Sequence, residues 1–229
     1  MKTIGLIGGM SWESTVPYYQ LINEYVKKEL GGLHSAKIAL YSVEFDEIEK
    51  CQSEDRWDDA AKILADAAVG LEKCGADFIL ICMNTMHKVY AQVQAAVSVP
   101  LIHIADATGD ALKAAGIQRV GLLGTRYTMQ QDFYKGRLAE AGFDVAVPPE
   151  EMIGELNRII FEELCVGEIK ETSRATFARA IEELKKEGCE GVILGCTEIG
   201  LLVRPEDSVL PVFDTTVIHA EGAAKKALE

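Results

Sequence analysis

The chain has 229 residues, of which 48% are hydrophobic and 26% are charged, with a formal net charge of −13. Its apolar runs have the length of strands and are interrupted by charge or glycine, so we expect no membrane span. The acidic charge argues against a nucleic-acid partner, which would need a basic face, but not against a small anionic substrate held by local donors.

Apolar segments of strand length alternate with amphipathic segments along the whole chain. The expected strands are Thr3–Ile7, Ile38–Val43, Phe78–Met83, Leu101–Ile104, Val120–Leu123, Asp144–Val147, Val192–Leu194 and Val212–Phe213. Residues 57–75 and 173–191 keep apolar residues at helical spacing and finish near a glycine, which predicts helices. Strands separated by helices indicate βαβ units and a mostly parallel sheet.

Three segments of the first half are echoed in the second half in the same order. "IGLIGG" at 4–9 resembles "VGLLGT" at 120–125, and "GADFILICMNT" at 75–85 resembles "GCEGVILGCTE" at 188–198. "VPLIHIADAT" at 99–108 is followed more weakly by "LPVFDTT" at 210–216. The near-constant offset of about half the chain predicts two similar α/β halves.

Polar residues gather where the predicted strands end, in "GGMSWES", "CMNTMH", "GTRYT" and "GCTEIG". Parallel α/β sheets bind ligands beyond the carboxyl ends of their strands, so these four loops are the expected site. The first glycine pair lacks the G-x-G-x-x-G spacing of a dinucleotide site, and no GxxxxGK[ST] phosphate loop is present. We therefore expect no nucleotide cofactor.

The second echo places Met83 opposite Cys196, Asn84 opposite Thr197 and Thr85 opposite Glu198. If the two halves face a common substrate, positions 83 and 196 flank it from opposite sides. Cys196 is the expected catalytic base, because a cysteine at a strand-to-helix junction can ionise near neutrality when backbone amides stabilise the thiolate. Such a pair of faces suits the removal of a proton from one side of a carbon and its return to the other.

Hydroxyl and amide groups near these positions are expected to bind the substrate. Asn84, Thr85 and Thr197 could hold an α-carboxylate and the enolate-like charge that develops as the α-proton leaves. Thr125 and Thr128 of "GTRYT" offer further donors, and Glu198 lies next to Cys196 in the chain. His87 is expected to support this loop rather than to transfer a proton.

The segments "IGLIGGMSWEST", "CMNTMHK", "GLLGTRYTM" and "GVILGCTEIGLL" resemble the aspartate/glutamate racemase family, and most closely its L-aspartate/glutamate-specific branch. The resemblance covers essentially the whole chain. It implies catalysis without pyridoxal phosphate, so we expect no cofactor and no metal. It also implies two pseudo-symmetric Rossmann-like domains, each with a parallel four-stranded sheet flanked by helices, with the active site between them, and commonly a homodimer.

The expected domains are residues 1–98 plus 209–229 and residues 99–208. By the resemblance, Met10 and Ser11 line the substrate, and Gln52 contacts its side-chain carboxylate. The expected substrate is a small acidic amino acid, aspartate or glutamate. Six cysteines without a metal or disulfide pattern indicate reduced thiols and a cytoplasmic location.

The family's first base is a cysteine, or a threonine in the L-specific branch, and this sequence has Met83 at that position. Methionine carries no exchangeable proton, so three explanations are open. Cys196 could act alone, with water or Thr85 supplying the second proton and inversion becoming slow. Cys82 could replace the missing base, although a shift of one residue points a strand side chain to the opposite face. The chain could also catalyse a different reaction.

Three functions follow from these observations. The first is an isomerase, a cofactor-independent racemase of aspartate or glutamate. The second is a one-base decarboxylase or lyase, as in arylmalonate decarboxylase, a relative that keeps only the second-half cysteine. The third is a degenerate family member that binds an acidic amino acid without converting it.

Overall fold

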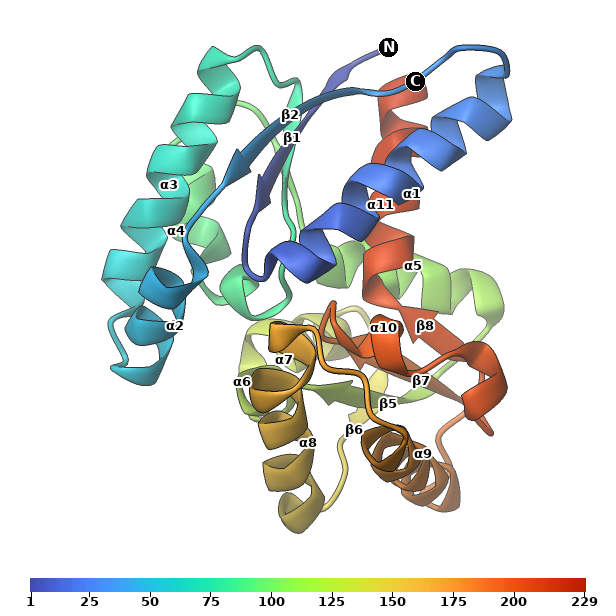
Figure 1. The fold of residues 1–229 in the computed structure, drawn as a ribbon. Helices are drawn as coiled ribbons and strands as arrows, with labels where there is room; N and C mark the ends of the chain where they lie inside the picture. The colour runs from blue at the N-terminus through green and yellow to red at the C-terminus, as the bar shows by residue number, and fades with distance from the viewer. The chain divides into compact units, whose positions relative to one another are not determined.

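A computed structural model describes residues 1–229. The chain forms two compact units, one made of residues 1–104 and 219–229 and the other of residues 105–218. Each unit is a parallel four-stranded sheet flanked by helices (Figure 1), as the sequence predicts. None of the helices combines the length and the apolar character needed to cross a membrane.

The first unit has its sheet in the order β2-β1-β3-β4. Its strands are β1 (Thr3–Gly8), β2 (Lys37–Ser42), β3 (Phe78–Ile81) and β4 (Leu101–Ile102). Its helices are α1 (Trp12–Leu30), α2 (Phe45–Ser53), α3 (Trp57–Lys73), the 3₁₀ helix η1 (Thr85–Val89) and α4 (Tyr90–Ala95), together with most of α11 (Thr215–Leu228).

The second unit has its sheet in the order β6-β5-β7-β8. Its strands are β5 (Arg119–Gly124), β6 (Asp144–Ala146), β7 (Gly191–Gly195) and β8 (Val212–Asp214). Its helices are α5 (Ile104–Ala115), α6 (Arg126–Gln130), α7 (Asp132–Glu140), α8 (Glu150–Glu162), α9 (Glu171–Lys186) and α10 (Ile199–Leu202), with 3₁₀ turns η2 (Leu164–Val166) and η3 (Pro205–Asp207).

The two sheets repeat one strand order, and the sequence echoes fall on equivalent strands. The first echo forms β1 and β5, the second forms β3 and β7, and the third forms β4 and β8. All eight predicted strands are present. Parallel strands buried on both faces read as continuous Val/Ile/Leu runs, which is why the sequence identified them so readily.

Both borders between the observed units lie further along the chain than the expected domain borders. Residues 99–104 were expected in the second domain, but β4 pairs with β3 of the first sheet. Residues 209–218 were expected in the first domain, but β8 pairs with β7 of the second sheet. Each of these strands therefore completes the sheet of the preceding half.

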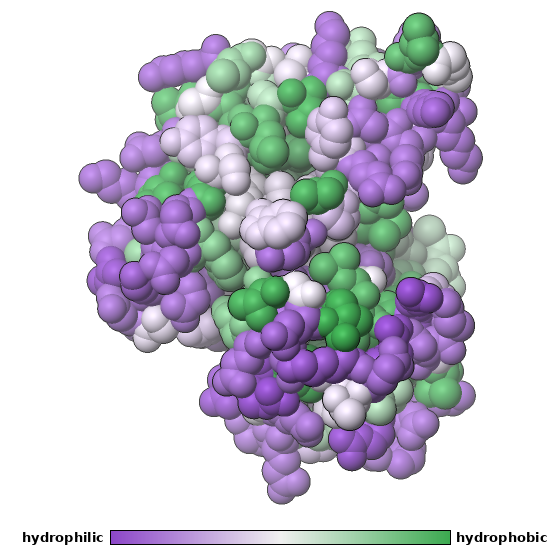
Figure 2. All heavy atoms as spheres, viewed as in Figure 1, coloured by the Kyte–Doolittle hydropathy of each residue, from purple (hydrophilic) through white to green (hydrophobic).

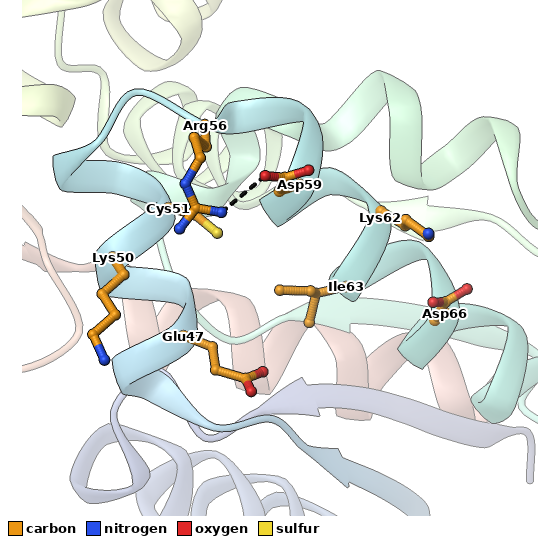
Figure 3. Close-up of a pocket in the computed structure, with 8 residues that line it drawn as sticks. All are labelled: Glu47, Lys50, Cys51, Arg56, Asp59, Lys62, Ile63 and Asp66. Atoms are coloured by element: carbon orange, nitrogen blue, oxygen red, sulfur yellow. Dashed lines mark hydrogen bonds and ion pairs between the residues drawn. The ribbon is translucent and has the colours of Figure 1, made fainter.

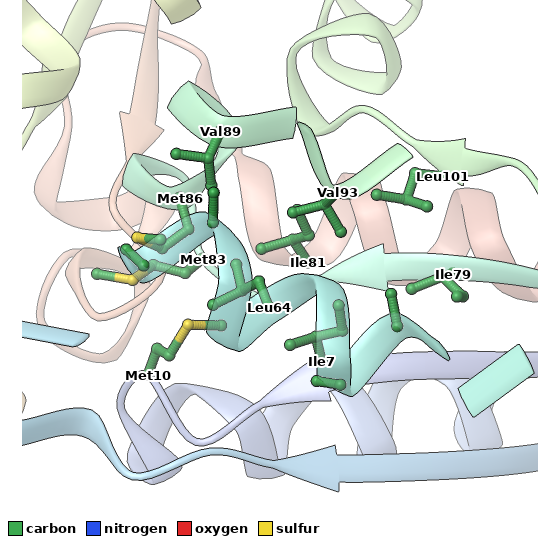
Figure 4. Close-up of a cluster of buried hydrophobic side chains, with 14 of the residues drawn as sticks. Ile7, Met10, Leu64, Ile79, Ile81, Met83, Met86, Val89, Val93 and Leu101 are labelled. Carbon is green, nitrogen blue, oxygen red and sulfur yellow. The ribbon is translucent and has the colours of Figure 1, made fainter. Parts of the chain in front are cut away.

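The first sheet has two buried faces with separate apolar clusters. Odd-numbered residues such as Ile7, Ile79 and Ile81 pack with Leu64 of α3 (Figure 4). Even-numbered residues pack on the other face, where Leu80 joins Tyr18 of α1. This alternation follows from the two-residue period of a strand, and it decides which loop side chains can meet beyond the strand ends.

The outer face of α1 carries exposed apolar side chains. Trp12, Val16 and Tyr19 are spaced by four and three residues, so they lie on one side of the helix. Figure 2 shows pale and green atoms among purple ones on the face of the molecule that carries α1 and β2. Three aligned apolar side chains in a chain of strongly negative net charge form an unusual surface feature.

Candidate active site

The loop after β1 is a tight turn that begins at Gly9. Gly9 has φ +92°, and a Cβ there would lie 2.3 Å from the carbonyl oxygen of Val43, so only glycine fits. The Gly9 amide donates to Thr15 Oγ1 at 2.9 Å, and that hydroxyl donates to the Ser11 carbonyl at 2.8 Å. Met10 and Ser11 are thereby fixed in a buried loop at the carboxyl end of β1.

The loop after β3 contains Met83, Asn84 and Thr85, all of which are buried. Met83 is 4% exposed and belongs to the same apolar cluster as Met10 and Met86. Figure 4 shows these three methionines gathered at one end of that cluster. The side chain at the position of the expected first base is therefore a packed core residue.

The side chain of His87 holds this loop in place by hydrogen bonds to main-chain atoms. Its Nδ1 lies 2.9 Å from the Met83 carbonyl oxygen, and its Nε2 accepts from the Ile104 amide at 3.2 Å. Because Nε2 is an acceptor, Nδ1 carries the proton and donates to Met83. His87 is thus neutral in this arrangement and links the β3 loop to the residues that follow β4, a supporting role like the one expected from the sequence.

Two further histidines lie beside His87. The ring centroid of His103 is 4.6 Å away and that of His219 is 6.0 Å away. Tyr18 Oη lies 2.9 Å from His219 Nδ1, and His219 Nε2 lies 3.0 Å from the Ile102 carbonyl. Burial lowers the pKa of His219 to about 3. His219 is therefore a neutral structural group, and nothing in the spacing of these histidines along the chain predicts that their rings lie together.

Gln52 lies on α2, and its side chain is buried. Its Nε2 lies 3.2 Å from Met86 Sδ, next to the three-methionine group. The first unit therefore brings Met10, Gln52 and the residues around Met83 towards one end of its core. A glutamine held there could orient a polar substrate group.

Cys82 lies on the other face of the first sheet, as the strand alternation predicts. It belongs to the cluster of Leu80 and Tyr18, whereas Met83 belongs to the cluster of Ile81. Complete burial raises the pKa of the Cys82 thiol. Cys82 can therefore not replace the missing first base without a rearrangement of the strand end.

In the second unit, the loop after β5 is organised by two threonines. Thr125 is the N-cap of α6, and its Oγ1 accepts from the Thr128 amide at 3.3 Å and lies 3.2 Å from Thr128 Oγ1. Cβ atoms built on Gly124 and Gly195 would both contact the Thr128 side chain. The glycines at the ends of β5 and β7 thus allow Thr128 to lie against both strands.

Cys196, Thr197 and Glu198 follow directly after β7 and are all buried. Cys196 Sγ donates to Glu198 Oε2 at 2.9 Å, and Thr197 Oγ1 donates to the same oxygen at 2.9 Å. The second-unit site residues are therefore a connected group in which one carboxylate oxygen receives both the thiol and a hydroxyl. The sequence named these three neighbours but not the contact between the thiol and the carboxylate.

One backbone hydrogen bond, at Glu198, lowers the pKa of the Cys196 thiol as expected, but other effects outweigh it. Burial raises the pKa of the Cys196 thiol well above its usual value, and the charge of Glu198 raises it further. The following helix, α10, has only four residues and begins three positions later. Cys196 is consequently a protonated thiol at neutral pH, with an acceptor already in place for its proton.

A surface cavity of about 410 Å³ lies between α2 and α3, next to Gln52 in the chain (Figure 3). Its walls are mostly charged, and Arg56 and Asp59 form an ion pair at 2.8 Å. None of the predicted site residues lines it. This cavity is therefore separate from the strand-end groups.

Comparison with known proteins decides the family. The family model of Asp/Glu/hydantoin racemases matches residues 7–223. The chain belongs to the Asp/Glu/hydantoin racemase family. This is an isomerase family, as the resemblance of the sequence motifs implied.

Three similar proteins extend the comparison of this racemase-family chain. The crystal structure of a proposed Asp/Glu racemase from Yersinia pestis is 56% identical, covers 100% of both chains and has a TM-score of 0.93. The structure of an aspartate racemase homologue, PH1733 from Pyrococcus horikoshii OT3, is 40% identical, also covers 100% of both chains and has a TM-score of 0.86. The broad specificity amino-acid racemase RacX of Bacillus subtilis strain 168 is 26% identical over 98% of each chain.

Proposed function

We propose that this racemase-family protein exchanges and inverts the α-proton of aspartate or glutamate, with Cys196 as the group that transfers the proton. The observation that carries the proposal is the contact between the Cys196 thiol and the Glu198 carboxylate at the end of β7. A thiol next to a built-in proton acceptor can act as an acid directly and as a base once its proton has moved.

Cys196 and Glu198 supply the proton steps at one face of the substrate. When Cys196 acts as a base, its proton passes to Glu198, and the resulting thiolate takes the α-proton of the substrate. When Cys196 acts as an acid, the thiol gives its proton to the carbanion and becomes a thiolate, which then takes a proton from water. The substrate α-ammonium group would favour the thiolate, because a nearby positive charge stabilises an anion.

The remaining site residues are assigned to substrate binding. Asn84, Thr85 and Thr197 are proposed to hold the α-carboxylate and to stabilise the negative charge that develops on it. The other proposed contacts are Met10, Ser11, Gln52, Thr125, Thr128 and Glu198. That the groups of both units serve one substrate stays a prediction from the sequence, as does catalysis without a cofactor.

Because of Met83, only one face of the substrate, the Cys196 face, has a proposed proton-transfer residue; we call this reaction one-sided. Its thioether carries no exchangeable proton, and its side chain is packed with Met10 and Met86. The second proton must therefore come from water or from a hydroxyl such as that of Thr85. We expect α-proton exchange at the Cys196 face to be faster than inversion.

The absence of an exchangeable proton on Met83 also favours a second candidate function, a one-base decarboxylase of a malonate-type acid. Loss of carbon dioxide from such an acid leaves a carbanion that a single proton donor can quench, so Cys196 would suffice without a residue at position 83. This reaction would use the protonated thiol that the structure contains. If the protein binds an acidic amino acid without converting it, neither reaction will be detected.

Proton NMR in deuterium oxide tests these functions. The α-proton of L- and D-aspartate and of L- and D-glutamate is followed separately, with chiral chromatography of the same samples. Exchange that disappears in Cys196→Ser supports the proposal, and slow inversion beside faster exchange supports its one-sided form. If no substrate exchanges, the racemase proposal is wrong, and carbon dioxide release from phenylmalonate then decides between decarboxylation and binding alone.

Homodimer formation and a cytoplasmic location also stay predictions. All six cysteines are free in the structure. The exposed stripe of Trp12, Val16 and Tyr19 on α1 is the surface we propose for self-association. These three positions carry no charge, so two copies of an acidic chain could approach there without direct repulsion.

A further inference from the structure

A second cavity, of about 450 Å³, lies in the second unit behind the loop that carries Cys196. It is lined by Ala111, Leu194, Gly200, Val203, Arg204, Pro205, Val212, Phe213, Asp214, Val217 and Ile218. These residues come from α5, the ends of β7 and β8, α10, the segment after it and the first turns of α11. The cavity contains none of the predicted site residues, and its volume is typical of a small-molecule site.

The walls of this cavity are apolar except for two side chains. Arg204 is exposed at the surface, and its guanidinium lies 3.9 Å from Glu206. Asp214 is partly buried, and its Oδ1 accepts from the amides of Thr216 at 2.8 Å and Val217 at 3.3 Å. Asp214 therefore caps α11 with one oxygen and keeps its carboxylate among apolar neighbours.

The second oxygen of Asp214 faces α10. A Cβ built on Gly200 would lie only 2.1 Å from Asp214 Oδ2, so the carboxylate approaches the helix where it has no side chain. Burial raises the pKa of Asp214, against the effect of its two amide donors. A carboxylate in an apolar recess is stabilised by a cation, because ion pairing compensates the loss of hydration.

α10 connects this cavity to the candidate active site. The Ile199 amide donates to the Cys196 carbonyl at 3.1 Å, and the Leu201 amide donates to the Glu198 carbonyl at 3.0 Å. Gly200 lies between these two residues and forms part of the cavity wall. A molecule that displaces α10 would therefore displace the main chain of the thiol and of its proton acceptor.

We propose that this cavity binds a small apolar molecule with a single ammonium group, which pairs with Asp214, and that its occupancy changes the environment of Cys196 through α10. The apolar part of the ligand lies against Val212, Phe213 and Val217. An anion would instead use Arg204, which is exposed and already has an acidic neighbour. The regulatory consequence rests on the proposed role of Cys196, whereas binding itself does not.

The first test is isothermal titration calorimetry with three probes of one shape: 2-phenylethylamine, 2-phenylethanol and 3-phenylpropanoate. We expect the amine to bind and the alcohol and the acid to bind at least about tenfold more weakly, since a charge-assisted hydrogen bond is lost. Asp214→Asn keeps an N-cap acceptor for α11 and should weaken binding of the amine by a similar factor. Glu140→Gln removes an exposed carboxylate of the same unit and should leave the affinity unchanged.

Val217→Phe gives a second variant that tests the cavity without touching the carboxylate. The larger side chain should occupy the recess and abolish binding of the amine, while circular dichroism checks that the variant is folded. The ligand class is wrong if the amine does not bind, if the acid binds as tightly as the amine, or if Asp214→Asn leaves the amine affinity unchanged. These results do not depend on racemase activity.

The coupling to the active site is tested by the alkylation rate of Cys196. Iodoacetamide labelling is followed by peptide mass spectrometry with and without saturating 2-phenylethylamine. We expect the rate to change at least about twofold, and Cys74, which is exposed, to keep its rate. An unchanged rate at Cys196 would refute the coupling even if the amine binds. A failure of the racemase proposal would instead appear only in the proton-exchange experiment.

Discussion

Cys196 Sγ donates a hydrogen bond to Glu198 Oε2 at 2.9 Å, so the candidate catalytic thiol is in direct contact with an acceptor for its proton. Two residues that are adjacent to Thr197 in the chain thus share one proton at the end of β7. Burial and the carboxylate charge both raise the pKa of the thiol. The enzyme we propose therefore starts from a thiol and a nearby base, rather than from a preformed thiolate.

Substitution of Glu198 by glutamine should change the alkylation rate of Cys196 and the rate of α-proton exchange in opposite directions. Removing the negative charge lowers the pKa of the Cys196 thiol, so alkylation of Cys196 at pH 8 should become faster. α-Proton exchange should fall roughly a hundredfold or more, because the proton acceptor of the thiol is lost. The measurement is the pH profile of Cys196 labelling, read by mass spectrometry, beside the exchange rate of L-aspartate in deuterium oxide.

Glu206→Gln is the matched control for this experiment, since Glu206 is an exposed carboxylate of the same unit. It should leave both the labelling profile and the exchange rate as in the wild type. If Glu198→Gln slowed labelling, the carboxylate would be favouring the thiolate, and the proton-acceptor role would have to be abandoned.

Met83→Cys should restore a proton donor at the position of the expected first base. We expect inversion of aspartate to rise by roughly a hundredfold, the usual contribution of one acid-base group. The shorter side chain leaves space beside Met10 and Met86, so the variant should lose about 1–3 kcal/mol of its unfolding free energy. Chiral chromatography and urea unfolding measure the two effects.

Met83→Leu tests whether any change at this buried position has the same effect. The substitution conserves volume and brings no proton donor, so inversion should stay at the wild-type rate and stability should change by less than about 1.5 kcal/mol. Equal inversion rates for the cysteine and leucine variants would show that position 83 does not face the reacting carbon.

The fold was predictable because its signals are local and repeated. Eight apolar runs gave eight strands, and the echoes at half the chain length gave two sheets of the same order. The domain borders were placed too early because sequence cannot show which sheet a two- or three-residue strand joins. β4 and β8 joined the preceding sheets through pairing with β3 and β7.

The places of the candidate site residues along the strands could be predicted from the sequence, whereas their electrostatics could not. Strand ends located Cys196 and Asn84, and strand alternation placed Cys82 on the opposite face from Met83. The pKa of Cys196 depends on burial and on the rotamer that brings Glu198 to the thiol, and neither follows from spacing along the chain. The link from His87 to Ile104 likewise arises only when the chain is folded.

His219 should make the protein less stable at acidic pH. Its pKa falls from about 6.5 in the unfolded chain to about 3 in the fold, so between these values the unfolded state binds more protons. Stability from this group is complete above pH 6.5 and is lost as pH falls towards 3. The expected loss is about 2 kcal/mol between pH 7.5 and pH 5.

Urea unfolding at both pH values measures this loss in the wild type, His219→Gln and His34→Gln. The His219 variant should lose the corresponding part of the pH dependence, whereas the exposed His34 variant should keep it. If all three proteins showed the same pH dependence, His219 would not be a buried neutral group in the folded protein.

Trp12→Lys should disrupt self-association if α1 forms the interface. The tryptophan side chain is 65% exposed in one copy of the chain and lies in line with Val16 and Tyr19. A lysine there places a charge in the apolar stripe while leaving the buried side of α1 unchanged.

Light scattering should show a dimer for the wild type and for Tyr25→Phe, and a monomer for Trp12→Lys. A wild-type monomer at micromolar concentration would exclude the dimer, and a dimeric Trp12→Lys variant would place the interface elsewhere.

Gly200→Ala should perturb the thiol site through the chain alone, without any ligand. The added Cβ would lie 2.1 Å from Asp214 Oδ2, so either α10 or the carboxylate must move. Because α10 is bonded to the carbonyls of Cys196 and Glu198, we expect lower stability, by about 1–3 kcal/mol, and a changed alkylation rate of Cys196. Gly222→Ala, in the middle of α11 with nothing within 4 Å of the new Cβ, should instead stabilise the protein by up to about 1 kcal/mol and leave the thiol unaffected. Thermal unfolding and peptide mass spectrometry compare the two variants, and equal effects would mean that Gly200 has no special contact with Asp214.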